Sequence, residues 1–185
     1  KTDLILDNLI ADKKAKPMVV VMMDGNVGSS GFGDQFYRVF QAELLNSVIP
    51  FVESNFRGLT DSKSRALAGL SMGGLQTLYA GLYNGEKFSA LGVFSSGWIQ
   101  GQQNMIADAQ YDFIAKNASQ INNNLKHFWI SMGSKEDIAY NNCQVMMKKF
   151  DELNIKYSYV DYPGGHTWPV WRLSLYNFAP VLFKD

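Results

Sequence analysis

The sequence predicts an α/β fold, a doubly wound and mostly parallel sheet with helices on both faces. Short apolar runs of strand length alternate along the chain with longer segments of helical periodicity. The run at residues 18–23 (Met-Val-Val-Val-Met-Met) is continuous, which is typical of a strand buried on both faces of a parallel sheet. No internal repeat or linker interrupts the pattern, so we expect one domain over residues 1–185.

The first half of the chain shows both periodicities. Leu6, Leu9 and Ile10 lie on one face of a short helix that ends at the polar residues 12–16, and Pro17 then introduces the apolar run. A glycine-rich loop extends from that run to Gly33. The expected elements are a helix at 4–10, a strand at 18–23, a helix at 36–56 interrupted by Pro50, a strand at 65–70 and a helix at 73–83.

The second half continues the alternation. A polar segment rich in Gln and Asn separates two strands, and we expect it to be helical with loops at the surface. Proline at position 169 favours a helix start, because its missing N–H would be unbonded there. The expected elements are a strand at 88–94, the polar segment at 101–124, a strand at 127–132, a helix at 139–153 with Val145, Met146 and Phe150 inward, a strand at 157–162 and a helix at 169–183.

Residues 69–73 (Gly-Leu-Ser-Met-Gly) carry the G-x-S-x-G pattern of a nucleophile elbow, a sharp strand-to-helix turn that exposes a serine. Glycine at both outer positions removes Cβ atoms that would collide with the neighbouring strand and helix. The turn presents the Ser71 hydroxyl above the sheet and places the Met72 N–H at a helix start, where it can stabilise an oxyanion. The alternative is a glycine-rich turn whose serine only caps the helix.

A serine hydroxyl needs a base within hydrogen-bond reach, and the chain contains two histidines. His127 opens a strand and lies at its amino end, which is the wrong edge of the sheet. His166 lies in a loop that directly follows the last strand, at the carboxyl edge where Ser71 is also expected. We therefore predict His166 as the general base.

The base needs a carboxylate partner, and acids in a loop after a strand lie at the same edge of the sheet. Between Ser71 and His166, Glu136 and Asp137 meet this condition. We predict Asp137, with Glu136 as the open alternative. The remaining acids in this part of the chain are expected to be solvated charges: Asp108, Asp112, Asp151 and Asp161.

Composition excludes several classes of function. The formal net charge is zero, which gives no indication of a nucleic-acid partner, and no apolar run approaches the roughly 20 residues of a membrane helix. The single cysteine, Cys143, cannot form an internal disulfide and is expected on a helix face. Cys, His and acidic residues do not cluster with metal-ligand spacing, so neither a metal nor another cofactor is expected.

Four blocks resemble carbohydrate esterase family one of the α/β-hydrolase superfamily: residues 69–77, 93–97, 132–137 and 162–168. The resemblance covers essentially the whole chain and implies a serine esterase with Ser71, Asp137 and His166 as its triad. It further implies feruloyl or acetyl esters of plant xylan as substrates, and a secreted or periplasmic location.

The chain departs from this family at its start. Members carry additional strands and a His-Gly loop before the helix that resembles residues 3–13, and that loop supplies a second oxyanion N–H. Gly25 and Gly28 do not replace it, because their loop resembles the one after the next strand. We expect residues 1–185 to be a fragment, a processed chain or half of a pair with a companion N-terminal segment. Loss of one oxyanion donor costs about 10²–10³ in turnover.

Two tryptophans are candidate substrate contacts. Trp98 follows a strand at the predicted catalytic edge, and Trp168 lies two residues from His166. Either could stack on a phenolic ring or a sugar, or instead plug its loop. Two rival functions stay open: hydrolysis of a siderophore or another small ester, and a non-catalytic carbohydrate-binding or structural relic.

Overall fold

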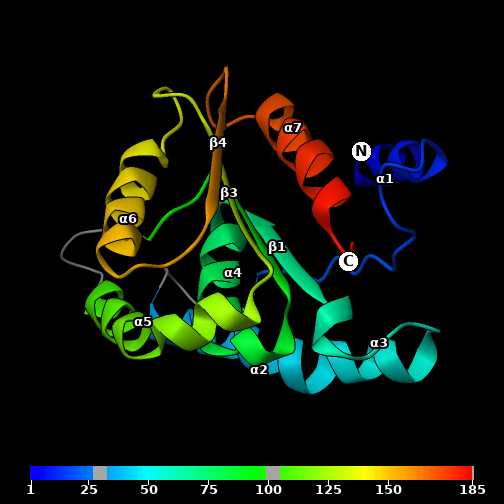
Figure 1. Ribbon diagram of the computed structural model, residues 1–185, viewed down its shortest axis with the longest axis horizontal. Helices are drawn as coiled ribbons and strands as arrows, with labels where there is room; N and C mark the ends of the chain where they lie inside the picture. Colours follow the sequence, from blue (N-terminus) through cyan, green and yellow to red (C-terminus); the bar gives the residue numbers. More distant parts are fainter. Residues whose placement is uncertain (27–32, 99–104, 185) are drawn as a thin grey trace.

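The computed structural model describes residues 1–26, 33–98 and 105–184 (Figure 1). Four strands form one parallel sheet in the order β1-β2-β3-β4. In the register, Ala66 pairs with Ala90, and Ala90 pairs with His127. The prediction of an α/β fold with a parallel sheet is confirmed. The strands are β1 (Ala66–Leu70), β2 (Ala90–Phe94), β3 (His127–Gly133) and β4 (Ser158–Tyr162).

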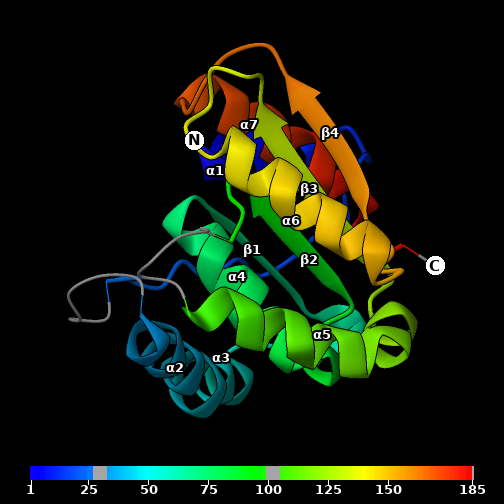
Figure 2. The same cartoon turned by 90° about the vertical axis from the view of Figure 1, so that its left-hand side faces the viewer.

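Helices cover both faces of the sheet. Figure 1 shows the strands between α5 and α6 on one side and α7 and α1 on the other, and Figure 2 shows α5 and α6 in front of the strands. The helix α4 packs against β1 and β2, whereas α7 contacts β2 and β3. The helices are α1 (Thr2–Ala11), α2 (Asp34–Glu43), α3 (Ile49–Asn55), α4 (Met72–Tyr83), α5 (Met105–Asn124), α6 (Tyr140–Glu152) and α7 (Trp168–Phe178).

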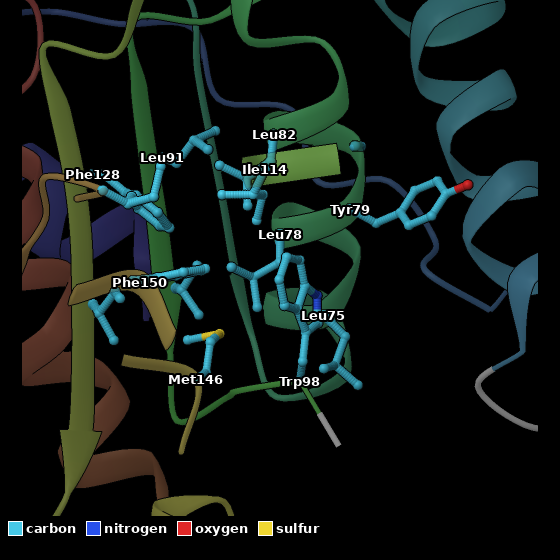
Figure 3. Packing of buried hydrophobic residues seen from close by; sticks show 14 of the residues in the cluster. Leu75, Leu78, Tyr79, Leu82, Leu91, Trp98, Ile114, Phe128, Met146 and Phe150 are labelled. Atoms are coloured by element: carbon cyan, nitrogen blue, oxygen red, sulfur yellow. The ribbon is translucent and has the colours of Figure 1, made fainter. Parts of the chain in front are cut away.

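The main hydrophobic core lies between the sheet and α4, α5 and α6 (Figure 3). Leu78 of α4, Leu91 of β2 and Phe150 of α6 are fully buried there. On the other face, Phe94 of β2 packs in an edge-to-face contact against Phe178 of α7. Every residue of β2 is buried, which agrees with a strand covered on both faces.

The expected interruption at Pro50 takes the form of a π turn. The helix α2 continues into a π-helical segment, Leu44–Val48, and α3 then begins with Pro50 in its first turn. Proline lacks an N–H group, and its ring clashes with the carbonyl four residues earlier in a regular α-helix. A wider turn before Pro50 removes that conflict without ending the helical run.

The predicted strand at residues 18–23 is wrong. The segment pairs with no strand in the described structure, and its side chains are largely exposed, Met22 to 79%. With 47–56, it borders an apolar groove of about 650 Å³ lined by Val19, Val20, Val21, Met22, Met23, Ser47, Val48, Phe51, Val52 and Phe56. An apolar run forms a strand only where a neighbouring strand binds its backbone. On this side of the described sheet β1 is the outer strand, and residues 18–23 do not pair with it.

The helix α6 corrects one smaller expectation. Met146 and Phe150 are fully buried as predicted, but Val145 points outward and is 43% exposed. The buried positions of α6 are Cys143, Met146, Met147 and Phe150, a spacing of three, four and seven residues that leaves Val145 off the inward face. Within the described ranges, no helix has the length and apolar character needed to cross a membrane.

Candidate active site

Ser71 occupies a sharp turn between β1 and α4. Its backbone has φ 74° and ψ −108°, and such a positive φ is rare for a residue with a side chain. The Ser71 N–H donates to the Phe94 carbonyl at 3.0 Å, and the Ser71 carbonyl accepts from the Leu75 N–H at 3.1 Å. The elbow predicted from the sequence is therefore present, and a hydrogen bond to the end of β2 and a first helical bond of α4 hold its strained backbone.

The glycines around Ser71 have different roles. A Cβ atom on Gly69 would lie 2.1 Å from the Gly73 carbonyl oxygen, so that only glycine fits at this crossing. A Cβ atom on Gly73 would meet nothing within 4 Å, and the predicted steric need for glycine at this position is wrong. Gly74 is the crowded position instead, since its Cβ would lie 2.4 Å from Cβ of Ser96.

The carboxyl edge of the sheet brings Ser71, His166 and Asp137 together. The Ser71 Oγ lies 2.9 Å from the His166 Nε2, and the His166 Nδ1 lies 2.8 Å from Asp137 Oδ1. His166 lies in the loop between β4 and α7, and Asp137 lies in the loop between β3 and α6. His127 is the first residue of β3, at the opposite end of that strand.

The Asp137 carboxylate is held by buried hydrogen bonds. Its Oδ1 also accepts from the Ala139 N–H at 2.9 Å, and its Oδ2 accepts from the Gly133 N–H at 3.3 Å. Burial raises the pKa of Asp137, but the polar groups around the carboxylate, the Ser95 hydroxyl, the Ala139 N–H and His166, outweigh burial and leave the pKa below its ordinary value. An ionised carboxylate only accepts, so the His166 Nδ1 carries the proton and Nε2 can accept from Ser71.

The structure distinguishes between the two adjacent acids. The Asp137 side chain is fully buried against His166, whereas Glu136 is exposed. The Asp137 N–H donates to the Ser134 carbonyl at 2.8 Å, a turn that directs residue 137 inward. Asp137 is thus the acid that reaches the imidazole.

Met72 is the first residue of α4, where backbone N–H groups have no acceptor within the helix. The predicted oxyanion donor therefore lies beside Ser71 at a helix N-terminus, whose partial positive charge favours an anion. Gly25 lies against this region, and its carbonyl accepts from Gln76 Nε2 at 2.8 Å. Gly28 lies outside the described residues.

The two candidate tryptophans lie in different environments. Trp98 is 2% exposed and packs edge-to-face on Tyr111 and Phe150 in the core, so the predicted substrate contact is wrong for this residue. Figure 3 shows its ring among the buried side chains of the core, beside Leu75. Trp168 is 61% exposed and remains available at the start of α7.

Sequence reasoning missed Trp171 and Ser96. The indole of Trp171 packs edge-to-face against the His166 ring, with 5.1 Å between the ring centroids. It packs in the same way against Trp168, with 5.0 Å between the centroids. The signal was the spacing of three residues between the two tryptophans, which places them on one face of α7. The Ser96 hydroxyl donates a hydrogen bond to the Ser71 carbonyl at 2.8 Å. From the sequence, no role was assigned to residues 93–97, which contain Ser96.

A family model described as putative esterase matches residues 1–180. The chain belongs to this esterase family. The endo-1,4-β-xylanase/feruloyl esterase of Xylanibacter ruminicola is 32% identical over 187 residues, which cover all of this chain and 24% of that protein. The chain thus spans about a quarter of the length of this curated relative.

Solved structures share the fold. The feruloyl esterase module of Clostridium thermocellum complexed with sinapinate superposes with a TM-score of 0.79 at 24% identity, over 100% of this chain and 70% of that one. The enterobactin esterase of Shigella flexneri superposes with a TM-score of 0.72 at 20% identity, over 95% of this chain and 46% of that one. In the described parts of the chain, no group of three or more His, Cys, Asp or Glu residues could hold a metal ion.

Proposed function

We propose that this chain is the catalytic part of a serine carboxylic-ester hydrolase in which Ser71, His166 and Asp137 act as a triad. The observation that carries the proposal is the continuous relay from Ser71 Oγ through both ring nitrogens of His166 to a buried carboxylate. Nucleophile, base and orienting acid in this order provide the geometry that acyl transfer requires. Membership of the esterase family supports the same reaction class.

The reaction proceeds in two steps. His166 Nε2 takes the Ser71 proton while Oγ bonds to the ester carbonyl carbon, and the Met72 N–H stabilises the resulting oxyanion. The protonated imidazole gives its proton to the leaving alcohol as the ester bond breaks and an acyl-serine remains. Water, deprotonated by the same nitrogen, then attacks the acyl carbon; the bond to Ser71 Oγ breaks, Oγ takes the proton back from His166, and the acid is released. Asp137 holds the imidazole in the required tautomer throughout and stabilises its charged form.

We further propose a feruloyl or acetyl ester of plant xylan as the substrate. The 32% identical relative is named as a xylanase/feruloyl esterase, and the exposed Trp168 ring lies next to Trp171, which contacts His166. An exposed indole offers a flat apolar surface for an aromatic acyl group or a sugar. A polymeric wall substrate requires action outside the cytoplasm, so a secreted or periplasmic location belongs to the same proposal.

A fluorophosphonate probe tests the reaction class. We expect one covalent adduct on the wild-type chain and none on Ser71→Ala, because the probe requires a serine activated by a base. Intact mass spectrometry measures both. Absence of an adduct on the wild-type chain would favour the non-catalytic relic.

Comparison of two esters tests the substrate. We expect a feruloylated arabino-oligosaccharide to be hydrolysed with a higher kcat/KM than a catecholate ester of the siderophore type. The catecholate ester is included because the enterobactin esterase shares the fold. The control is Ser71→Ala, which must abolish both activities. A preference for the catecholate ester would replace the xylan substrate by a siderophore-type ester.

A further inference from the structure

Ser95 directly follows β2 and combines three unusual properties. Its backbone has φ 46°, in the left-handed region that residues with side chains seldom adopt. The residue is fully buried, and its hydroxyl oxygen makes no hydrogen bond that meets normal geometry within the described structure. Leaving a buried hydroxyl unsatisfied costs about 1–3 kcal/mol, so this arrangement requires a reason.

The backbone fixes Ser95 beside the predicted catalytic acid. Its N–H donates to the Ser131 carbonyl of β3 at 2.8 Å, which ties the end of β2 to the strand that leads to Gly133. The Gly133 N–H in turn donates to Asp137 Oδ2. Ser95 and Asp137 therefore lie at one corner of the sheet, and the Ser95 hydroxyl is among the groups that lower the pKa of Asp137.

The Asp137 carboxylate has an acceptor position left for this hydroxyl. Oδ1 already accepts from His166 and Ala139, whereas Oδ2 accepts one long bond from Gly133. A carboxylate offers about four lone-pair sites, and a hydroxyl hydrogen rotates freely toward an acceptor. A Ser95 hydroxyl hydrogen directed at Oδ2 would satisfy the buried donor and the second carboxylate oxygen together.

We propose that Ser95 is a positioning residue whose hydroxyl donates to the Asp137 carboxylate and holds it in line with His166. The next residue, Ser96, donates to the Ser71 carbonyl, so that two successive hydroxyls support the acid and the nucleophile from the end of one strand. The role in turnover rests on the proposed esterase function, but the hydrogen bond itself does not.

Carboxyl NMR of Asp137 tests the hydrogen bond without any need for activity. We expect Ser95→Ala to raise the pKa of Asp137, since a donor to its charged form is removed. The titratable groups that face this carboxylate are His166 and the Cys143 thiol of α6, and burial raises the pKa of Cys143 to about 12, so the thiol stays neutral. Ser95→Gly suits the left-handed backbone and must show the same rise.

Ser131→Ala is the matched control, because Ser131 also has a buried hydroxyl without a partner in the described structure. It should leave the Asp137 titration unchanged. Equal shifts in both variants, or no shift in either Ser95 variant, would overturn the proposal.

Kinetics then test positioning. With a hydrolysed ester, Ser95→Ala should lower kcat about 10- to 100-fold with little change in KM, as expected for loss of a hydrogen bond to a charged group. The same substitution in an Asp137→Asn background should have almost no further effect. A fully additive loss would overturn the positioning role. If the protein lacks esterase activity while the Asp137 titration shifts as expected, the function fails and the hydrogen bond stands.

Discussion

Asp137→Asn is expected to lower kcat about 10⁴-fold, the loss seen when the acid of a comparable serine hydrolase is converted to its amide. The asparagine amide group can donate to the His166 Nδ1, which places the ring proton on Nε2. That nitrogen then faces Ser71 Oγ as a donor, at the 2.9 Å contact where an acceptor is needed. The measurement is kcat on an aryl ester, with circular dichroism to verify the fold.

Glu136→Gln is the matched control for this substitution. The two acids are adjacent, but Glu136 is exposed, so its kcat should stay within about twofold of the wild type. A larger loss from Glu136→Gln than from Asp137→Asn would transfer the acid role to Glu136 and contradict the observed relay.

The pH dependence of stability gives the same carboxylate a second readout. Because the folded pKa of Asp137 lies below its ordinary value, its contribution to stability is present above the unfolded pKa of about 3.9 and is lost as the pH falls through the folded value. Across the neutral range the group stays ionised. Loss of activity near neutral pH therefore has another origin than protonation of Asp137.

The sequence predicts the position of a site residue where that position depends only on the strand that precedes it. Ser71, Asp137 and His166 each follow a strand, and parallel strands end at one edge, so their proximity could be predicted. The choice between residues 136 and 137 could not, because it depends on the turn that directs Asp137 toward Gly133 and His166.

Predictions that depend on burial were less secure. Trp98 and Trp168 both lie in segments that follow strands, yet Trp98 packs against α5 and α6 and Trp168 is exposed. The apolar run at 18–23 has the composition of a buried strand, but composition does not supply the neighbouring strand that its backbone needs. Ser95 escaped notice because neither its left-handed backbone nor its buried hydroxyl is visible in a dipeptide of serines.

Gly69→Ala is expected to remove about 3 kcal/mol or more of stability and to abolish labelling of Ser71. The added Cβ would lie 2.1 Å from the carbonyl oxygen and 2.2 Å from the carbonyl carbon of Gly73, both backbone atoms that no rotamer change can move. Either β1 separates from α4 or the turn opens, and both displace the Ser71 hydroxyl from His166. Thermal unfolding should show a decrease in Tm of about 6–12 °C.

Gly73→Ala tests whether the motif needs glycine at both outer positions or only at Gly69, where β1 crosses α4. The added methyl group meets nothing within 4 Å, and alanine stabilises a helix by about 0.5–1 kcal/mol relative to glycine. We therefore expect a folded protein with an unchanged or slightly raised Tm, whose Ser71 is still labelled by the fluorophosphonate. If Gly73→Ala were as damaging as Gly69→Ala, the two glycines of the motif would be needed for their backbone freedom. The close approach of β1 to α4 would then not be the reason for glycine at position 69.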